Sequence, residues 1–353
     1  MASTAAPVPE HKPTREPKNS KFTQQELPAL KPLLTPVWVS AVFFVIALVF
    51  IPIGAACLAA SAGVTEISAR YDDTCMPGRT NSDKDRSLAQ LEGAGTSCNI
   101  TLTAPSHMKP PIYLYYELQN YYQNHRRYVK SRSDSQLRGT GNDLSATSDC
   151  APEQLLQSDG SSKLIMPCGL IAWSFFNDTY AVTADLEGSP TPVAVDETGI
   201  AWESDIKHKF GSQDAQNFNL QENADHRGGS TITGPLNADE HFIVWMRTAA
   251  LSHFRKLWGR IDTDIPKGTI ITIAVANRYN TYRFDGQKHV VLSTSSWLGG
   301  KNNFLGIAYI VVGGISFLSG CAFFLVQWRF PRQRGDVSYL SWNANAAATT
   351  ELH

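Results

Sequence analysis

The sequence predicts a membrane protein with two transmembrane helices and a large β-rich domain between them, antiparallel and of the α+β type. Three observations lead to this fold class. Two apolar stretches without a charged residue occupy residues 37–60 and 304–328. The segment between them, residues 61–303, contains several runs rich in Ile, Val, Thr and aromatic residues, which are typical of strands. That same segment holds all the cysteines that lie outside the two apolar stretches.

Both apolar stretches are long enough to cross a membrane. A helix rises about 1.5 Å per residue, so either stretch spans a hydrocarbon core about 30 Å thick. A buried helix of a soluble domain is the alternative, and the length of the stretches argues against it. The first stretch begins too far from the N-terminus and is too long for a signal peptide, so we expect it to remain as an anchor. Trp38, Trp297 and Trp328 lie at or near the ends, where interfacial aromatic residues gather.

The charges beside the two stretches predict the orientation. The basic residues compared are Lys18, Lys21 and Lys31 before the first stretch, Arg70 and Arg79 after it, Lys288 and Lys301 before the second, and Arg329, Arg332 and Arg334 after it. Both comparisons favour cytosolic termini, each by a single residue. We therefore expect cytosolic tails at residues 1–36 and 329–353, and a lumenal or extracellular domain at residues 61–303.

Four cysteines in the middle segment indicate an oxidising compartment. They are Cys75, Cys98, Cys150 and Cys168, and an even number predicts two disulfides. Four cysteines allow three pairings, which the residues alone leave open. A zinc site is the competing interpretation, but none of the spacings forms a CxxC pair. We predict no metal and no cofactor.

Two glycosylation sequons fall in the same middle segment, at Asn99 and Asn177. A single Asn-X-Thr sequence often arises by chance. Here the sequons, the cysteines and the flanking charges agree on one topology, and this agreement supports the predicted lumenal or extracellular domain.

The middle segment reads as one domain of strands with helical insertions. We expect strands at residues 99–103, 112–118, 242–247, 269–276 and 290–294, and short helices at 119–131 and 252–261. Asp285-Gly286 is a hairpin candidate. Residues 209–238 read as a surface loop, residues 1–20 as a disordered tail and residues 21–36, with three prolines, as an extended segment.

A cluster of basic residues follows one predicted strand. It contains His125, Arg126 and Arg127, with Lys130 and Arg132 close behind. Such a cluster can dock onto acidic loops of a partner or onto lipid headgroups. The alternatives are a solvated helix face and local ion pairs, and the residues alone leave all of these open.

Glycines recur on one face of the second apolar stretch. Gly306, Gly313 and Gly320 are seven residues apart, which is about two helical turns. Small residues let helix backbones approach closely in lipid. This face could pack within the chain, against a partner, or both.

Nothing in the sequence argues for catalysis. Asp196-Glu-Thr-Gly resembles the phosphorylated D-K-T-G sequence of P-type ATPases, but Glu replaces the Lys, and we interpret the segment as a turn between two strands. No HExxH, GxSxG, GxxxxGK or EF-hand pattern is present. The net charge of −1 also gives no reason to expect a nucleic-acid partner.

Long stretches of the chain resemble a known family. They include KFTQQELPALKPLLTP, YYELQNYYQNHRRYVKSRSDSQLRG, PCGLIAWSFFNDTY, HFIVWMRTAALSHFRKLWGRID and VVLSTSSWLGGKNNFLGIAYIVVGG. Over nearly its whole length the chain is similar to the ligand-effect modulator family, the non-catalytic β-subunits of type IV P-type ATPases, which are called ALA-interacting subunits in plants. Two places depart from the family pattern, the NRYNTYRF segment and Trp173.

The resemblance implies a function and a set of sites. It implies a heterodimer with one catalytic alpha subunit, which hydrolyses ATP and moves membrane lipids, and a role in the folding, export and activity of that flippase. It implies residence in the endoplasmic reticulum, the Golgi and endosomal membranes and the plasma membrane. It further implies the disulfides Cys75–Cys98 and Cys150–Cys168 and a glycan at Asn177.

Within this assignment, the cluster with Arg126, Arg127 and Lys130, and the glycine face, become candidate partner-binding sites. Three other functions compete with the assignment on topology. A subunit of a two-span ion channel shares the two spans and the disulfide-bonded domain, a receptor-like or lectin-like protein is the second rival, and a lumenal enzyme ranks last.

Overall fold

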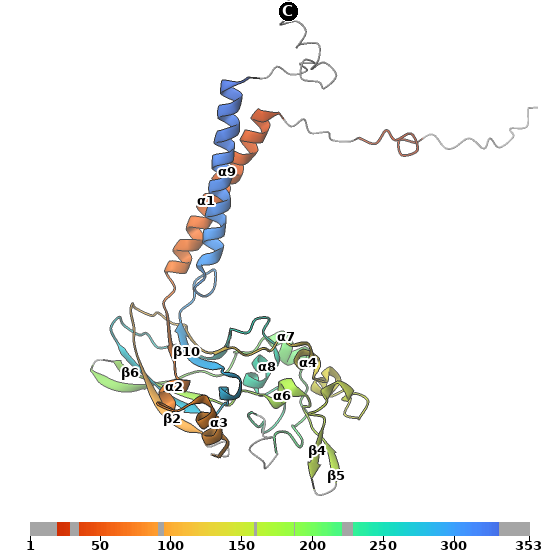
Figure 1. The fold of residues 1–353 in the computed structure, drawn as a ribbon, viewed down its shortest axis with the longest axis vertical. Helices are drawn as coiled ribbons and strands as arrows, with labels where there is room; N and C mark the ends of the chain where they lie inside the picture. The colour runs from red at the N-terminus through yellow and green to blue at the C-terminus, as the bar shows by residue number, and fades with distance from the viewer. Residues whose placement is uncertain are drawn as a thin grey trace, which may run out of the picture. The chain divides into compact units, whose positions relative to one another are not determined.

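In chain order, one apolar helix precedes a β-rich domain and another follows it, which confirms the predicted fold class (Figure 1). The structure is a computed structural model that describes residues 20–28, 35–90, 95–158, 161–186, 188–220 and 229–331. The expected disordered tail at 1–20 and the C-terminal tail therefore fall almost wholly outside the described residues. Of the segment expected to be extended, residues 21–25 form a turn instead, and residues 29–34 are not described.

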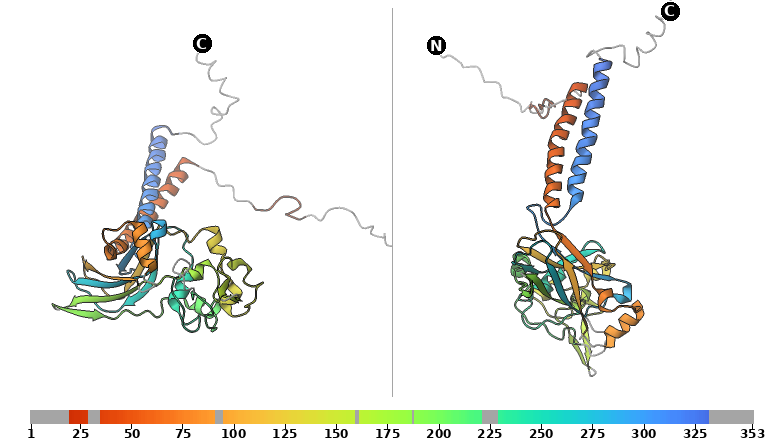
Figure 2. Two further views of the ribbon diagram at one scale, coloured as in Figure 1. Left: turned by 60° about the horizontal axis from the view of Figure 1, so that its bottom comes forward. Right: turned by 90° about the vertical axis from the view of Figure 1, so that its left-hand side faces the viewer.

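The helices α1 (Pro36–Ala62) and α9 (Asn303–Arg329) are each long and apolar enough to cross a membrane. They lie side by side in every view (Figures 1 and 2). The rings of Phe43 and Phe323 stack with centroids 5.8 Å apart. Where α1 ends and α9 begins, Ser61 Oγ donates a hydrogen bond of 2.6 Å to Asn303 Oδ1. The two helices therefore pair through direct side-chain contacts.

The β-rich domain, which we call the ectodomain, contains two four-stranded sheets and a hairpin. The first sheet has the order β1 (Glu66–Arg70), β10 (Gln287–Ser293), β3 (Ile112–Gln119) and β8 (Phe254–Ile261). The second has the order β2 (Thr96–Thr103), β9 (Ile270–Asn277), β6 (Thr179–Leu186) and β7 (Ser189–Val193). β4 (Leu155–Ser158) and β5 (Ser161–Leu164) form the hairpin. All paired strands are antiparallel.

The described residues of the ectodomain also form short helices, joined by loops. They are α2 (Asp72–Cys75), α3 (Asn81–Gln90), α4 (Arg126–Lys130), α5 (Asp134–Arg138), α6 (Leu170–Trp173), α7 (Glu203–His208) and α8 (Glu240–Met246), with the 3-10 turns η1 (Ser148–Cys150) and η2 (Tyr282–Phe284). Figure 2 shows the sheets on one side of the ectodomain and the helices α4 to α8 on the other.

Both sheets contribute side chains to one hydrophobic core. Along β3 and β9, buried and less buried residues alternate, as expected when one face of a strand is packed. Tyr180 of the second sheet meets Trp258 of the first edge-to-face, with ring centroids 5.2 Å apart. The sheets therefore pack face to face over a shared aromatic and aliphatic layer.

Four of the five predicted strands are confirmed. Residues 99–103 lie in β2 and residues 112–118 in β3. The prediction at 269–276 is one residue early at both ends of β9, and the prediction at 290–294 starts three residues late and ends one residue late relative to β10. The Asp285-Gly286 hairpin prediction was wrong, because β9 and β10 belong to different sheets and η2 separates them.

The strand predicted at 242–247 is the helix α8. Asp239 caps its N-terminus, with a carboxylate that accepts a 2.9 Å hydrogen bond from Phe242 N. At the other end, Lys256 Nζ donates bonds of 2.9 Å to the carbonyls of Val244 and Trp245. Burial lowers the pKa of Lys256 to about 7. One cap is adjacent to the helix in sequence and the other is distant. Together they satisfy the backbone groups at the helix ends and outweigh the β propensity of the aromatic run.

The helix predicted at 252–261 is the strand β8. Its register against β3 shifts between Leu114 and Tyr115, which pair with Gly259 and Leu257, so Trp258 is an extra residue. This bulge breaks the alternation of apolar residues that identifies a strand.

The helix predicted at 119–131 is reduced to α4. Gln119 still belongs to β3, and Asn120 has a φ of 60°, in the left-handed region that ends regular structure. Helical backbone begins only after His125, which is extended.

Candidate partner-binding surface

The basic cluster is exposed and largely uncompensated. His125, Arg126, Arg127 and Lys130 are all exposed. We call residues 125–130 the basic segment. Across the described part of the chain, no ion pair joins Arg126, Arg127 or Lys130 to an acidic side chain, whereas Arg132 lies 3.0 Å from Asp134. The ion-pair alternative therefore applies only to Arg132, and the other cations remain available to a partner.

Hydrogen bonds from polar side chains hold the basic segment against the ectodomain. Gln123 is fully buried, and its Oε1 accepts a 2.9 Å hydrogen bond from Ala249 N. Asn124 Nδ2 donates a 2.9 Å bond to Ala250 O. The Tyr128 hydroxyl lies 2.8 Å from Ser174 Oγ, and burial raises its pKa well above the ordinary value, so it stays protonated. The charged side chains thus project from a fixed backbone.

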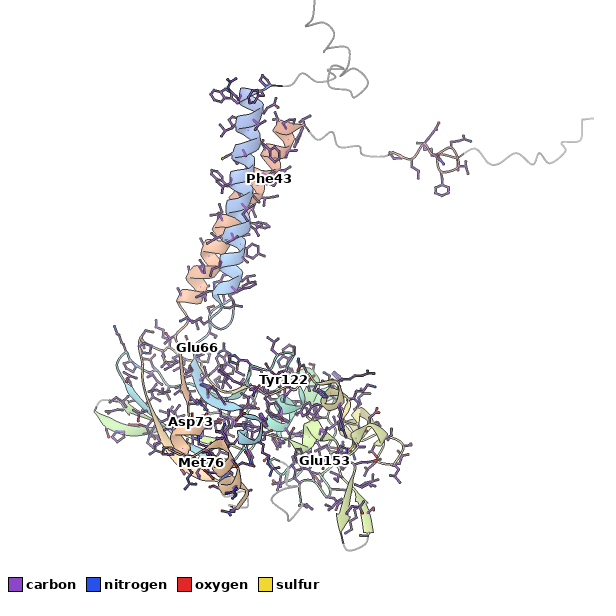
Figure 3. All side chains as sticks on the ribbon, viewed as in Figure 1. Phe43, Glu66, Asp73, Met76, Tyr122 and Glu153 are labelled. Atoms are coloured by element: carbon purple, nitrogen blue, oxygen red, sulfur yellow. A yellow bond between two sulfur atoms is a disulfide. The ribbon has the colours of Figure 1, made fainter. Side chains whose placement is uncertain are left out.

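An aromatic groove of 570 Å³ runs beside the basic segment. Its lining residues include Tyr121, Tyr122, Tyr128, Trp173, Phe284, His125 and Arg127. Tyr122 is 60% exposed (Figure 3). We call this cavity the aromatic groove. Its volume lies within the range of about 300–1,000 Å³ that is usual for ligand pockets.

Packed rings support the floor of the groove. The ring of Tyr121 meets Phe284 and Trp245 edge-to-face at centroid distances of 5.3 and 5.9 Å. Trp245 is fully buried and donates a 2.8 Å hydrogen bond from Nε1 to Ile171 O. Because these rings are locked by their neighbours, the groove is already formed in the isolated chain.

The structure joins Cys75 to Cys98 and Cys150 to Cys168, the pairs that the family resemblance implies. The first disulfide links α2 to β2, and the second links η1 to the residues just before α6.

The second disulfide lies where α4 meets α6. Ser131 Oγ accepts a 2.9 Å bond from Leu170 N and donates a 3.3 Å bond to Cys150 O. Gly169 has a φ of 100°, and a Cβ there would collide with the Ser131 carbonyl. Since Tyr128 and Trp173 both line the aromatic groove, this disulfide helps to set its walls.

A buried ion pair that sequence reasoning missed stands between the two sheets. Lys288 and Asp178 both have fully buried side chains, and Lys288 Nζ lies 2.6 Å from Asp178 Oδ2. Lys288 also donates to Asn277 Oδ1 and to the Tyr279 carbonyl. The Tyr71 hydroxyl donates a 2.7 Å bond to the same Asp178 oxygen. Burial lowers the pKa of Lys288, and the Asp178 carboxylate opposes that shift.

The position of Lys288 changes the count of basic residues beside the second apolar stretch. As a buried residue of β10 it is not a charge at the membrane surface, so only Lys301 remains of the two basic residues compared before the second stretch. The excess of basic residues after that stretch becomes larger, and it still favours a cytosolic C-terminus.

The two sequons occupy different surroundings. Asn99 is exposed on β2, an edge strand of its sheet. Asn177 is half-buried just before β6, and its Oδ1 is buried without a hydrogen-bond partner. Glycosylation of either residue stays a prediction.

The segment that resembles a phosphorylation sequence forms a turn. Asp196 Oδ1 accepts hydrogen bonds from Thr198 N at 3.0 Å and from Thr198 Oγ1 at 2.7 Å. The turn follows the strand β7, as predicted, but it precedes the helix α7 and not a second strand.

The glycine face of α9 packs against α1 of the same chain. A Cβ added to Gly306 would lie 2.6 Å from Leu58 Cγ, and one added to Gly313 would lie 2.7 Å from Ile51 Cγ1. At Gly320 the nearest atom would be Phe44 Cε1, at 3.2 Å. The glycines therefore permit close helix packing within the chain, and a role in partner binding stays a prediction.

Gly313→Leu is expected to lower the thermal unfolding midpoint of the full-length protein in detergent. The new side chain overpacks the contact with Ile51, at a cost of about 1–3 kcal/mol. The neighbouring Gly314 provides the matched control, because a Cβ there meets nothing within 4 Å. Equal midpoints for the Gly313→Leu and Gly314→Leu variants would contradict the packing role.

Comparison with known proteins identifies the family. The LEM3 (ligand-effect modulator 3) family / CDC50 family matches residues 57–333. The chain is 51% identical over 340 residues to ALA-interacting subunit 3 of Arabidopsis thaliana, covering 95% of this chain and 93% of that protein. It is 37% identical to Cell cycle control protein 50A of Mus musculus, covering 90% of each, and 37% identical to Cell cycle control protein 50B of Homo sapiens, covering 91% and 96%. With two apolar helices, a disulfide-bonded β-rich ectodomain and matches across nearly its whole length, this chain belongs to the LEM3/CDC50 family.

Proposed function

We propose that this chain is the non-catalytic accessory subunit of a type IV P-type ATPase, a phospholipid flippase. The observation that carries the proposal is its similarity along 95% of its length to a protein named ALA-interacting subunit 3. In this proposal the partner is the catalytic alpha subunit, which binds and hydrolyses ATP, and the two chains form a heterodimer. The chain itself catalyses no reaction.

The basic segment and the aromatic groove together form the docking surface in this proposal. Arg126, Arg127 and Lys130 supply positive charge that the described residues do not neutralise. The groove beside them supplies a preformed apolar pocket. Interfaces gain most from aromatic anchors in pockets, and charge complementarity adds orientation and specificity. The partner segment that fits this surface is an acidic loop with an aromatic or aliphatic side chain.

The topology belongs to the same proposal. Residues 1–36 and 329–353 are cytosolic, residues 37–60 and 304–328 cross the membrane, and residues 61–303 lie in the lumen or outside the cell. The two disulfides fit an oxidising compartment. The subunit supports the folding of its partner, its exit from the endoplasmic reticulum and its activity in Golgi, endosomal or plasma membranes.

Arg126→Ala combined with Arg127→Ala is expected to lower the yield of the complex by about tenfold, which corresponds to about 1.4 kcal/mol of binding. Both side chains are exposed without an ion pair, so the ectodomain should keep its thermal stability. The measurement is the amount of catalytic subunit recovered with the tagged chain.

A matched control is the pair Lys109→Ala and Lys267→Ala, which removes two exposed charges outside the basic segment. An equal loss of yield in both double variants would mean that net charge, and not this surface, governs the interaction. An unchanged yield for the arginine variant would remove the basic segment from the interface.

A further inference from the structure

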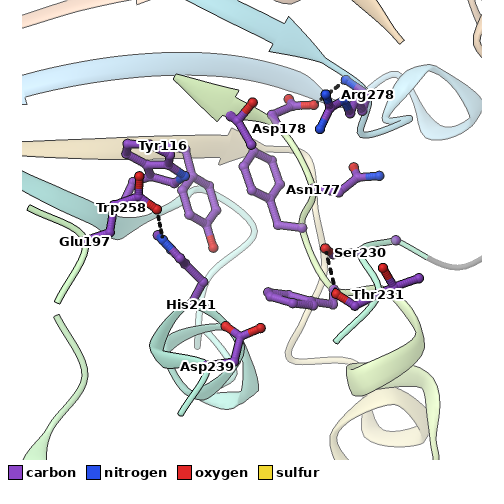
Figure 4. A pocket seen from close by; sticks show the side chains of 14 residues that line it. Tyr116, Asn177, Asp178, Glu197, Ser230, Thr231, Asp239, His241, Trp258 and Arg278 are labelled. Carbon is purple, nitrogen blue, oxygen red and sulfur yellow. Dashed lines mark hydrogen bonds and ion pairs between the residues drawn. The ribbon is translucent and has the colours of Figure 1, made fainter. Parts of the chain in front are cut away.

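A polar cleft of 260 Å³ opens beside the second sequon (Figure 4). Side chains from seven separate segments line it, including Asn177, Glu197, Thr231, Asp239, His241 and Trp258. No residue of the basic segment belongs to it, so this cleft is distinct from the aromatic groove.

The surrounding contacts fix how Asn177 is presented to the cleft. The residue before Asn177 is Phe176, whose ring stacks on Tyr116 with centroids 3.9 Å apart. The residue after Asn177 is Asp178, which is held by the buried ion pair with Lys288. The amide oxygen of Asn177 is buried without a partner, and among the described residues no hydrogen bond engages its amide nitrogen. The amide thus has its oxygen toward the protein and its nitrogen free to carry a substituent.

The cleft combines ring faces with hydrogen-bonding groups. The rings of His241 and Trp258 lie 5.4 Å apart, and His241 Nε2 lies 2.8 Å from Glu197 Oε2. Asp239 is half-buried, and burial raises the pKa of its carboxyl group. A pyranose ring fits this chemistry, since it presents C–H faces to rings and hydroxyls or an amide to carboxylates.

The size of the cleft limits the occupant. Pockets for drug-sized ligands measure about 300–1,000 Å³, so 260 Å³ is suited to about one sugar ring. Asn99, the other sequon, does not line the cleft and lies on the exposed side of an edge strand. A sugar attached at Asn177 would start inside the cleft, whereas a sugar at Asn99 would start in solvent.

We propose that the cleft binds the first N-acetylglucosamine of the chain's own N-linked glycan, attached to Asn177. The sugar stacks on the His241 and Trp258 side of the cleft, and its amide and hydroxyl groups bond to Asp239 and Thr231. Covalent attachment keeps the sugar at a high effective concentration, so weak contacts are sufficient to hold it. The glycan then acts as a structural element that joins the start of β6 to α8.

The test is site-resolved deglycosylation of the full-length chain, purified without its partner from a host that leaves high-mannose glycans. Endoglycosidase H cuts between the two innermost sugars, and mass spectrometry of glycopeptides reports each site. The expected result is release at Asn177 at least about tenfold slower in the folded protein than after denaturation, because a local opening must precede cleavage. The exposed Asn99 glycan should show no such difference.

A second variant separates binding in the cleft from general shielding. Thr231→Trp narrows the cleft at an exposed position and keeps the sequon intact. Release at Asn177 should then approach its rate in the denatured chain. The proposal is overturned if the mature protein carries no glycan at Asn177, if native and denatured rates are equal, or if resistance persists in folded Thr231→Trp. No partner takes part in these measurements, so such a result would leave the accessory-subunit proposal intact.

Discussion

Asp178→Ala is expected to lower the unfolding free energy of the ectodomain by about 3–5 kcal/mol, the usual cost of removing one partner from a buried ion pair. The variant leaves the Lys288 ammonium without a counterion in a fully buried position. It also removes the acceptor of the Tyr71 hydroxyl and of the backbone N–H group of Tyr279. Thermal unfolding of the purified protein and the yield of folded chain both report this loss. The substitution keeps the Asn-X-Thr sequon, so glycosylation does not confound it.

Lys288→Met is the informative comparison. It leaves Asp178 with the Tyr71 hydroxyl and the backbone donors, which continue to stabilise the carboxylate. We therefore expect Lys288→Met to be less destabilising than Asp178→Ala. The opposite order would mean that the lysine, with its bonds to Asn277 and the Tyr279 carbonyl, is the more important member of the pair.

Loss of the Cys150–Cys168 disulfide should have the second-largest effect, about 2–5 kcal/mol. The bond lies beside Ser131 and Leu170, where the walls of the aromatic groove meet. A Cys150→Ser, Cys168→Ser double variant avoids a stray thiol. It is expected to be retained in the endoplasmic reticulum with immature glycans and to recover little partner.

The natural control is Cys321→Ser, because Cys321 is a free cysteine in α9. The glycans of that variant should mature normally. Normal glycan maturation of the double variant, with an unchanged unfolding midpoint, would show that the disulfide is dispensable for the fold.

Strands with regular alternation could be predicted from the sequence. β2, β3, β9 and β10 are rich in Ile, Val, Leu, Thr and Tyr, and in β3 and β9 buried residues alternate with less buried ones, so local composition and burial agree. β6 carries the same signal, since Tyr180, Val182 and Ala184 alternate and are buried, yet it was missed.

Other elements depend on partners far away in the chain. α8 holds a run of aromatic and aliphatic residues that suits a strand. Its helical state is supported by a cap from Lys256 on the strand β8. β8 holds a bulge at Trp258 that can be recognised only once its pairing with β3 is known. Local propensity is outweighed by tertiary contacts in both cases.

The candidate site was predicted in part. The charges of the basic segment are visible in the sequence, but their lack of ion pairs is a property of the fold. The aromatic groove combines residues from around positions 121, 173 and 284, and no short motif joins them. The Lys288–Asp178 pair could not be recognised in the sequence either. Lys288 resembled a membrane-flanking charge, and Asp178 occupies the variable position of a sequon.

Recovery of the partner tests the central claim most directly. The tagged full-length chain is purified from its own cells in mild detergent, and the recovered proteins are identified and quantified by mass spectrometry. The account predicts a type IV P-type ATPase in near one-to-one amount. Recovery of the chain alone, or with chaperones only, would contradict the accessory-subunit function and would make ionic currents from the chain expressed alone the next measurement.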